Sequence, residues 1–564
     1  MPSLVYDVKD VRTIRELLTN SVELYPDRVA FLFKDKESNV RTKTYKEVYN
    51  DVIGLATYLN AKGYKNKKIA VMGHNCYEWA LTYLAVTCGC GVIVPIDKEL
   101  KAPDVENILS ISQTDLIVHT PELKETIDQC SGSFDRISTD MLPACVDQGK
   151  TLLQQGDQSY DNHTINPYEM GILLFTSGTT GMAKGVMLSQ ANICANIVSI
   201  RKGLYVSPND RTLSILPLHH TYECTAGFLA VLYSGASIAY AENLRRILAD
   251  LQLFAPTILI TVPLLLENIY ANIKKKLNAA KGGKLKFAVG KTLAATAATL
   301  NFDIKKRIFK QIHNVFGGRL EKIICGAAAL APEIAAAFDA FGLPVYNGYG
   351  LTETSPVCIM HNDAVRDHYS IGKPISGVEV RLDAINEEGV GEIVVKGPNV
   401  MLGYYNNPEE TAKVLIDGWF YTGDLATVDK KGNYRIVGRI KNMIVTKNGK
   451  NIFPEEIEYQ LNKSPYIKES MVYGEEAAQD VLVTAVIYPD FEVVDEHLAQ
   501  SGIVPGTERY NAELKALLSA TVKEANANVP NYKFIRRFLI RYTEFDKTTT
   551  RKIKRNSIEN MKGE

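Results

Sequence analysis

A run of hydroxyl-bearing residues and glycines between residues 171 and 186 has the composition of a phosphate-binding loop. Its members are Thr176, Ser177, Gly178, Thr179, Thr180 and Gly181, followed by Lys184. The apolar run before it, Ile172–Phe175, is typical of a buried strand. Glycines let backbone N–H groups approach an anion, hydroxyls donate hydrogen bonds to it, and the lysine adds positive charge. Surface linkers share this composition, but the preceding strand and the following lysine favour a phosphate site.

Two other nucleotide-binding patterns are excluded by spacing. A P-loop needs a lysine directly after its second glycine, whereas Lys184 stands three positions after Gly181 and precedes a further glycine. The segment Gly290-Lys291-Thr292 lacks the upstream glycine, because Leu285 occupies that position. The sequence therefore does not predict a P-loop nucleotide hydrolase.

Two further segments follow predicted strands and carry small or polar residues. Gly326, Ala327 and Ala328 come after the predicted strand 322–324, and small side chains permit close approach of a ligand to the backbone. The segment 346–354 contains a G-x-G but has Glu353 where a dinucleotide fingerprint needs a third glycine. A dinucleotide-binding site is therefore not predicted there.

Four segments, in this order along the chain, resemble the motifs of the adenylate-forming enzymes, the family of acyl-CoA synthetases, luciferases and peptide-synthetase adenylation domains. They are TSGTTGMAKGV at 176–186, NGYGLTET at 347–354, TGD at 422–424 and GRIK at 438–441. The resemblance extends over roughly residues 20 to 556. It implies ATP and Mg²⁺, acyl-AMP as an intermediate, and coenzyme A as the acceptor of the acyl group.

The resemblance also implies how the nucleotide is bound. Phosphates would be held by residues 176–181, Lys184 and Thr352, and ribose by Asp424 and Arg439. Tyr349 would stack on adenine, and Asn347 would meet the adenine edge. Small residues would lie close to the nucleotide, namely Gly326, Ala327, Ala328, Gly348 and Gly350. Glu353, with Thr176, would hold Mg²⁺, a hard cation that takes few protein carboxylates besides phosphate oxygens.

Four more residues receive roles in the two reaction steps from the resemblance. His220, in L-P-L-x-H-x-x-E, would position the substrate carboxylate, and Lys552 would be the catalytic lysine, with Lys554 as the alternative. Asp546 and Arg551 replace the proline and glycine usual in that last motif. Lys441 would be a hinge, and Gly449 would let a pantetheine arm pass close to the backbone.

The segment 274–322 is the most individual part of the chain. It carries thirteen Lys and Arg residues but only two acidic ones, Asp303 and Glu321. Its C-terminal part is similar to the insert of long-chain acyl-CoA synthetases, which implies a fatty acid substrate. A solvated helical hairpin is the simpler interpretation, and peripheral contact with anionic lipid or with CoA phosphates is a further one.

Two alternatives for the function of the chain stay open: a ligase that loads an acyl-carrier protein, and a non-catalytic binding protein of the same fold.

The elements that must position these residues alternate between strand and helix patterns. Strands are predicted at 29–33, 68–72 and 91–95, and helices near 13–18 and 77–87. This alternation predicts the α/β class with doubly wound, mostly parallel sheets. With the resemblance, we expect a large N-terminal domain (1–438) that includes a small β-barrel-like subdomain, a hinge (439–441), and a small mobile α+β domain (442–564).

Composition excludes several other classes of protein. The 564 residues contain 64 Lys plus Arg and 64 Asp plus Glu, so no net field favours nucleic acid. The N-terminus lacks the pattern of a secretory signal, apolar runs are too short for a membrane span, and the nine cysteines are scattered. We therefore expect a cytoplasmic protein, with free thiols. The oligomeric state is left open.

Overall fold

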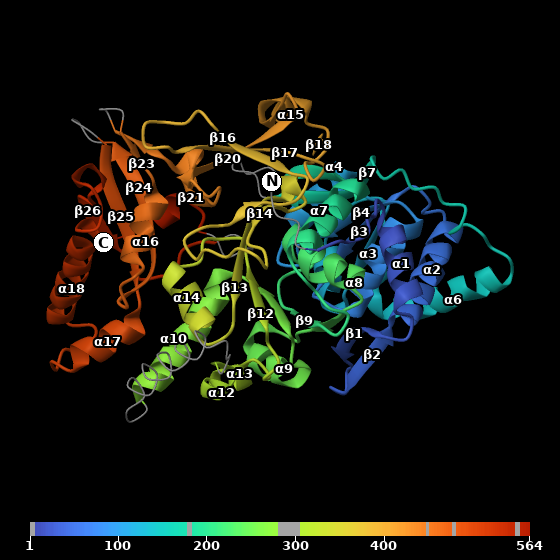
Figure 1. Cartoon of the computed structure of the whole chain (residues 1–564), viewed down its shortest axis with the longest axis horizontal. Coiled ribbons are helices and arrows are strands. Elements are labelled where there is room, and N and C mark those ends of the chain that lie inside the picture. The colour runs from blue at the N-terminus through green and yellow to red at the C-terminus, as the bar shows by residue number, and fades with distance from the viewer. Residues whose placement is uncertain are drawn as a thin grey trace. The chain divides into compact units, whose positions relative to one another are not determined.

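The computed structural model describes residues 6–176, 183–279, 305–446, 450–476, 481–547, 553–555 and 557–563 (Figure 1). The chain divides into two compact units. The first comprises Met1–Val380, Val394–Tyr421 and Asp429–Arg435, and the second Arg381–Ile393, Thr422–Val428 and Ile436–Glu564. Each unit has its own sheets and its own apolar core.

A seven-stranded sheet in the first unit has the order β18-β8-β7-β4-β3-β5-β6. Its strands are β3 (Lys68–Met72), β4 (Val92–Ile96), β5 (Leu116–His119), β6 (Asp135–Ser138), β7 (Met170–Thr176), β8 (Lys184–Ser189) and β18 (Gly403–Tyr404). The strands from β7 to β6 are parallel, whereas β8 and β18 run antiparallel to their neighbours. The helices that follow them are α3 (Tyr77–Gly89), α4 (Ala102–Ser112), α5 (Lys124–Asp128), α6 (Leu142–Gln154) and α7 (Gln190–Gly203).

A nine-stranded sheet in the same unit has the order β15-β14-β13-β12-β11-β9-β10-β1-β2. Its strands are β1 (Val29–Lys34), β2 (Val40–Thr44), β9 (Arg211–Ser214), β10 (Ser237–Tyr240), β11 (Ile258–Thr261), β12 (Lys322–Cys325), β13 (Val345–Gly350), β14 (Val357–Met360) and β15 (Lys373–Pro374). The strands from β13 to β1 are parallel, and the outer strands β2, β14 and β15 are antiparallel. The predicted mostly parallel α/β architecture is confirmed.

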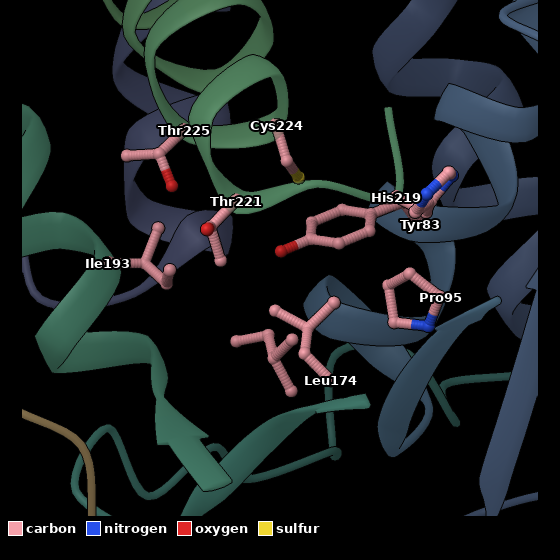
Figure 2. Close-up of a pocket in the computed structure, with 9 residues that line it drawn as sticks. Tyr83, Pro95, Leu174, Ile193, His219, Thr221, Cys224 and Thr225 are labelled. Atoms are coloured by element: carbon pink, nitrogen blue, oxygen red, sulfur yellow. The ribbon is translucent and has the colours of Figure 1, made fainter. Parts of the chain in front are cut away.

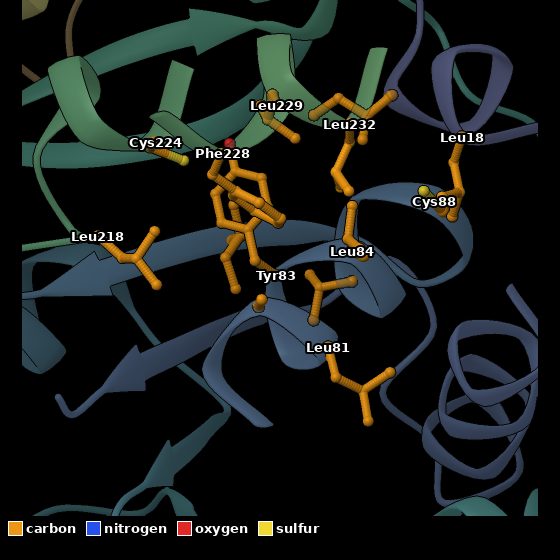
Figure 3. Close-up of a cluster of buried hydrophobic side chains, with 14 of the residues drawn as sticks. Leu18, Leu81, Tyr83, Leu84, Cys88, Leu218, Cys224, Phe228, Leu229 and Leu232 are labelled. Carbon is orange, nitrogen blue, oxygen red and sulfur yellow. The ribbon is translucent and has the colours of Figure 1, made fainter. Parts of the chain in front are cut away.

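The first unit contains further helical segments. They are α1 (Ile14–Leu24), α2 (Tyr45–Ala61), the π-helical segment Tyr222–Leu229, α8 (Ala230–Tyr233), α9 (Ile247–Phe254), α10 (Pro263–Ala279), α12 (Lys305–Ile308), α13 (Lys310–Val315), α14 (Pro332–Ala340) and α15 (Pro408–Val414). Figure 3 shows the apolar cluster where α3 meets the π-helical segment and α8. The Tyr83 and Phe228 rings meet there edge to face, 5.9 Å apart. This packing anchors the segment that begins just after His220.

Local sequence patterns explain the start of α7 and the burial of β7. Ser189 caps α7, since its side chain accepts a hydrogen bond from the Asn192 N–H while the Asn192 side chain accepts one from the Ser189 N–H. The predicted strand 172–175 is the core of β7, and its Leu173 is fully buried. The predicted phosphate loop therefore does follow a core strand.

A smaller sheet contains β16 (Glu379–Asp383), β17 (Gly391–Lys396), β19 (Leu415–Ile416), β20 (Trp419–Val428) and β21 (Tyr434–Arg439). Its order is β16-β17-β20-β19, and β21 pairs with β20. Strands β16, β17, β20 and β21 each contribute residues to both compact units. The boundary between the units thus crosses strands and not only loops.

The rest of the second unit is an α+β fold, as predicted. It contains the hairpin β22 (Ile444–Val445) and β23 (Asn451–Ile452), the sheet β24 (Ile467–Glu476), β25 (Val481–Pro489) and β26 (Arg537–Ile540), and the helices α16 (Pro454–Leu461), α17 (Phe491–Ala499) and α18 (Glu508–Asn526). Pro454 begins α16, with Glu455 and Glu456 in its first turn. Leu461, Ile487 and Leu514 are fully buried in its core.

None of the described helices combines the length and apolar composition needed to cross a bilayer. All nine cysteines lie in described ranges, and each is a free thiol.

Candidate active site

The β7–β8 hairpin places the first predicted phosphate ligands opposite each other. Thr176, the last residue of β7, pairs with Lys184, the first residue of β8. The Thr176 hydroxyl donates to the Lys184 carbonyl oxygen at 3.5 Å. Ser177, Gly178, Thr179, Thr180 and Gly181 lie outside the described residues. The two ends of the predicted loop are therefore held together by a strand pair.

The Lys184 ammonium already has an acidic partner. Its Nζ lies 2.5 Å from Glu410 Oε2 on α15 and 5.3 Å from the centroid of the Tyr404 ring. Lys184 and Lys413 together lower the pKa of Glu410 to about 2, so this carboxylate is ionised at neutral pH. The lysine predicted to bind phosphate thus rests against a carboxylate and an aromatic face.

Tyr404 joins this lysine to the predicted metal ligand. Its hydroxyl donates to Glu353 Oε1 at 3.0 Å, and the Met401 N–H donates to the Glu353 carbonyl oxygen at 2.9 Å. Because β18 pairs with β8, Tyr404 reaches across from the seven-stranded sheet to a residue that follows β13 of the nine-stranded sheet. Lys184 from one sheet and Glu353 from the other thus share Tyr404 as a neighbour.

Neither Tyr404 nor Glu410 was identified from the sequence. Their role depends on β18 joining the β8 edge, and the pairs Gly403↔Met187 and Tyr404↔Val186 are more than two hundred positions apart. The local signal, an Asn-Pro helix start followed by two glutamates, indicates only the beginning of α15. No motif in the segment indicated a contact with Lys184.

The predicted adenine-facing segments lie at the carboxyl ends of adjacent parallel strands. Cys325 of β12 pairs with Asn347 of β13, so Gly326, Ala327 and Ala328 follow directly beside Asn347. Gly326 packs against Tyr222, because a Cβ at Gly326 would lie 3.0 Å from the Tyr222 ring. Ala327 has a φ of 69° in the left-handed region. This edge of a parallel sheet is where ligands bind in doubly wound folds.

The two glycines of the G-x-G differ in why they are needed. A Cβ at Gly350 would lie 1.8 Å from the Pro356 carbonyl oxygen, so packing within the chain requires glycine there. A Cβ at Gly348 would meet nothing closer than 3.8 Å. Packing therefore does not require glycine at 348, and the close approach of a ligand there stays a prediction.

Two asparagines hold the turn that carries Thr352 and Glu353. Asn196 of α7 and Asn399 both donate from their side-chain amides to the carbonyl oxygens of Thr354 and Val357. Both asparagines are fully buried. They were not identified from the sequence, because a single buried asparagine has no distinctive pattern there.

His220 lies between a strand end and the π-helical segment. The backbone N–H of His220 donates to the Pro217 carbonyl oxygen. The centroids of the His220 and His219 rings are 4.1 Å apart. His219 Nε2 lies 3.5 Å from Asp97 Oδ2. His219 also lines a small, mainly apolar cavity with Tyr83 and Cys224 (Figure 2).

Glu223 is a fully buried carboxyl group in the same segment. Burial raises its pKa to about 8, although Oε1 accepts a hydrogen bond from Ser214 Oγ at 2.6 Å. Ser214 Oγ in turn accepts from Asn75 Nδ2, and Asn75 Oδ1 accepts from the Leu218 N–H. This network holds the chain just before His220.

The predicted ribose ligands lie in the second unit and contact each other. Arg439 Nε lies 2.6 Å from Asp424 Oδ1, and Arg439 Nη2 donates to Oδ2 at 3.3 Å. This is a two-point contact between a planar guanidinium and a buried carboxylate. Partial burial is the main cause of a lowered pKa of Lys441, and repulsion from the Arg439 charge lowers it too.

The two remaining predicted residues, Gly449 and Lys552, lie outside the described residues, but the ends of their segments are described. Thr446 and Lys450 are joined by backbone and side-chain hydrogen bonds at the end of the β22–β23 hairpin. Lys547 and Ile553 form an antiparallel bridge. Arg555, three positions after Lys552, donates to Glu458 Oε1 at 2.8 Å.

The donor set fits a nucleotide-bound Mg²⁺ better than a metal held by protein alone. Glu353 supplies one carboxylate, supported by the Tyr404 hydroxyl. Within the described ranges, no three His, Cys, Asp or Glu side chains gather as a metal cage. Mg²⁺ is commonly held by one or two carboxylates together with substrate phosphates and water.

Comparison with known proteins decides the family. A profile of AMP-binding enzymes matches residues 18–405, and a profile of the AMP-binding enzyme C-terminal domain matches residues 441–561. The chain belongs to the AMP-binding enzyme family. The resemblance stated from the four motifs is confirmed.

Two relatives within the family are named for long-chain fatty acids and for two different acceptors. The long-chain-fatty-acid–CoA ligase FadD15 of Mycobacterium bovis is 28% identical over 91% of this chain and 90% of its own length. The chloroplastic long-chain-fatty-acid–[acyl-carrier-protein] ligase AEE15 of Arabidopsis thaliana is 27% identical, over 85% of this chain and 77% of its own length.

A solved structure of the o-succinylbenzoate CoA synthetase of Bacillus subtilis, in complex with ATP and magnesium ion, shares the fold. Its TM-score is 0.73 at 20% identity, over 96% of this chain and 99% of that one. The predicted fold, with a large N-terminal and a small C-terminal domain, is confirmed by this likeness among AMP-binding enzymes.

Proposed function

We propose that this AMP-binding enzyme activates a fatty acid with ATP and transfers the acyl group to coenzyme A. The observation that carries the proposal is the junction at Tyr404, which contacts Lys184 of one sheet and Glu353 of the other, while Thr176 pairs with Lys184 in the strand hairpin. Hydroxyl, cation and single carboxylate are the groups that a magnesium–triphosphate complex requires.

In the first step, a substrate carboxylate oxygen attacks the α-phosphorus of ATP. The bond from that phosphorus to the bridging oxygen breaks, and pyrophosphate leaves with its negative charge. Lys184 would hold the departing phosphates, Lys552 would bridge the carboxylate and the α-phosphate, and His220 would orient the carboxylate. Mg²⁺, held by Glu353, would screen the phosphate charge. These groups act by positioning and by electrostatic stabilisation.

In the second step, the thiol sulfur of coenzyme A attacks the acyl carbon. The bond from that carbon to the AMP oxygen breaks, AMP leaves, and the thiol proton passes to solvent. We infer that a loop containing Gly449 admits the pantetheine arm, and that Lys441 acts as the hinge of the small domain between the two steps. Hinges of this kind absorb a change in a few backbone dihedral angles.

A long-chain acid is the preferred substrate in this proposal, supported by the FadD15 relative and by the basic segment that ends near Lys322. The test is AMP formation with acetate, octanoate, palmitate and benzoate in the presence of coenzyme A. We expect the highest kcat/KM with octanoate or palmitate. Preferential turnover of benzoate would contradict the fatty acid assignment.

The alternative acceptor is an acyl-carrier protein, favoured by the AEE15 relative. Pyrophosphate exchange cannot separate the two acceptors, because both share the first step. Acyl transfer is therefore measured with palmitate and ATP, adding either coenzyme A or a phosphopantetheine-bearing carrier protein. Thioester formation on the carrier protein alone would replace coenzyme A as the acceptor. If no acid on the panel releases AMP, a non-catalytic binding protein is the better interpretation.

Peripheral membrane contact through residues 274–322 is part of the same proposal. The described basic residues of this segment include Lys274, Lys305, Lys306, Arg307 and Lys310. Co-sedimentation with phosphatidylserine vesicles, compared with phosphatidylcholine vesicles, tests it. We expect binding to the anionic vesicles only, and it should weaken as the salt concentration rises.

A further inference from the structure

Asn347 and His361 form a two-point pair where β13 and β14 separate. The backbone N–H of His361 donates to the Asn347 carbonyl oxygen at 2.8 Å, and the backbone N–H of Asn347 donates to Nδ1 of the His361 ring at 3.0 Å. The regular strand pairing ends one residue away, at Gly348↔Met360. The imidazole thus supplies the acceptor that a backbone carbonyl would supply in a continuing ladder.

The other side of the imidazole meets Ser370. His361 Nε2 lies 3.4 Å from Ser370 Oγ. Because Nδ1 accepts a hydrogen bond, the ring proton of the neutral imidazole resides on Nε2 and points at this hydroxyl. Ser370 Oγ donates to the Asp367 carbonyl oxygen and accepts from the Gly372 N–H. The donor and acceptor capacity of this hydroxyl is therefore fully used, so its orientation is determined.

Ser370 also holds the Asn347 side chain. Asn347 Nδ2 donates to the Ser370 carbonyl oxygen at 3.2 Å. A carbonyl oxygen only accepts, so the amide NH₂ must face Ser370 and the amide oxygen, Oδ1, must face the other way. His361 is 1% exposed and Ser370 is 7% exposed, whereas Asn347 is only half-buried. A buried pair thus orients an amide at the edge of the candidate site.

His361 keeps this arrangement over a wide pH range. Burial, helped by the nearby charges of His368 and Arg366, lowers the pKa of His361 to about 4, although hydrogen bonds to the Asp367 and Ser370 backbone act in the opposite direction. The imidazole is therefore neutral under ordinary assay conditions, and Nδ1 remains an acceptor.

We propose that His361 is a positioning residue that, together with Ser370, presents the Asn347 amide oxygen to the exocyclic amine of the nucleotide base. This inference rests on the proposed function, in which Asn347 meets the base. It deepens that function by making an acceptor oxygen the source of selectivity for a 6-amino purine over a 6-oxo purine. A site built to bond an N–H group rejects an analogue that lacks it, because its buried polar group is left unpaired.

The test compares ATP with inosine triphosphate, which carries an oxygen in place of the 6-amino group. Acid-dependent pyrophosphate exchange gives kcat/KM for each nucleotide, and equilibrium dialysis with a non-hydrolysable ATP analogue gives binding without turnover. The variants are His361→Phe, which keeps a ring but no acceptor, His361→Asn, whose Oδ1 can replace Nδ1, and Asn347→Ala.

We expect the wild-type protein to prefer ATP by at least about a hundredfold. His361→Phe should reduce the preference about tenfold, mainly by raising KM for ATP and weakening analogue binding, with kcat little changed. His361→Asn should restore part of the preference. Adding His361→Phe to Asn347→Ala should have no further effect on selectivity, because the orienting residue then has no amide to orient.

The outcomes separate this inference from the function on which it rests. If the wild-type protein catalyses no exchange with any acid, the proposed function fails. If Asn347→Ala loses selectivity while His361→Phe and His361→Asn keep it, His361 is structural only and the inference is overturned. Should His361→Phe not fold, the same comparison made with Ser370→Ala decides: selectivity equal to that of the wild-type protein overturns the inference.

Discussion

The Lys184 ammonium lies 2.5 Å from the Glu410 carboxylate, at a position where the proposed mechanism needs it for the phosphates of ATP. Glu410 and a triphosphate would therefore compete for the Lys184 ammonium in the proposed mechanism. Since Glu410 also contacts Lys413, the carboxylate retains a partner when Lys184 leaves it.

We therefore expect Glu410→Gln to lower KM for ATP about threefold, the size typical of a solvent-accessible ion pair. Removing the competing charge frees the lysine, while Gln keeps the length of the side chain. Initial-rate kinetics with varied ATP measure this. Lys413→Ala is the matched control, because it removes the other cation from the same carboxylate and should raise KM slightly or leave it unchanged. A higher KM in Glu410→Gln would mean that Glu410 orients Lys184 instead of competing for it.

Tyr404→Phe should increase the Mg²⁺ requirement of the reaction. The Tyr404 hydroxyl donates to Glu353 Oε1, and removing a hydrogen bond that orients a metal ligand typically weakens metal binding about tenfold or more. The measurement is the Mg²⁺ concentration that gives half-maximal exchange at fixed ATP. Tyr405→Phe is the control, since the Tyr405 ring lies near Lys68 instead. An equal shift in both variants would argue against a role for Glu353 in holding the metal.

Lys552→Ala should separate the two half-reactions. Loss of one charge-stabilising donor costs about 10² to 10³ in rate, roughly 2.7 to 4 kcal/mol. Formation of acyl-AMP should fall by this factor, whereas thioester formation from supplied acyl-AMP should largely survive. Lys554→Ala is the matched control. If Lys554→Ala alone shows the effect, the catalytic lysine is Lys554.

Glu223 should make stability depend on pH in an unusual direction. Its folded-state pKa of about 8 lies above the ordinary glutamate value of about 4.3, so the folded protein holds more protons between these values. The free energy of unfolding should therefore fall as pH rises through this window, by up to about 1.4 kcal/mol per pH unit. Urea unfolding at pH 5.5 and 7.5 measures it.

Glu223→Gln keeps the shape of the side chain and its acceptor for Ser214 but cannot ionise. The free energy of unfolding of this variant should therefore not show the decrease with rising pH. The exposed Glu37→Gln serves as control and should keep the wild-type pH dependence. If Glu223→Gln and the wild-type protein show the same slope, Glu223 is not protonated in the folded state.

Sequence analysis predicted the parts of the site that reside in contiguous segments. The strand before the phosphate loop depends on a local apolar run, and it agrees with the structure. The contacts of Tyr404 with Glu353 and of Glu410 with Lys184 could not be predicted, because they require the register of β18 against β8. The role of His361 could not be predicted for a similar reason, because its pairing with Asn347 exists only after β13 and β14 have formed.

The pairing of β18 with β8 also has a consequence for synthesis of the chain on the ribosome. Strand β8 ends at Ser189, but the strand that covers its outer edge does not emerge until residues 403 and 404, more than two hundred positions later. During that interval the nascent sheet presents an uncovered edge, which is a template for wrong pairing. We expect a chain truncated after residue 400 to aggregate and to engage chaperones during translation more than one truncated after residue 440, as ribosome-bound pull-down would measure.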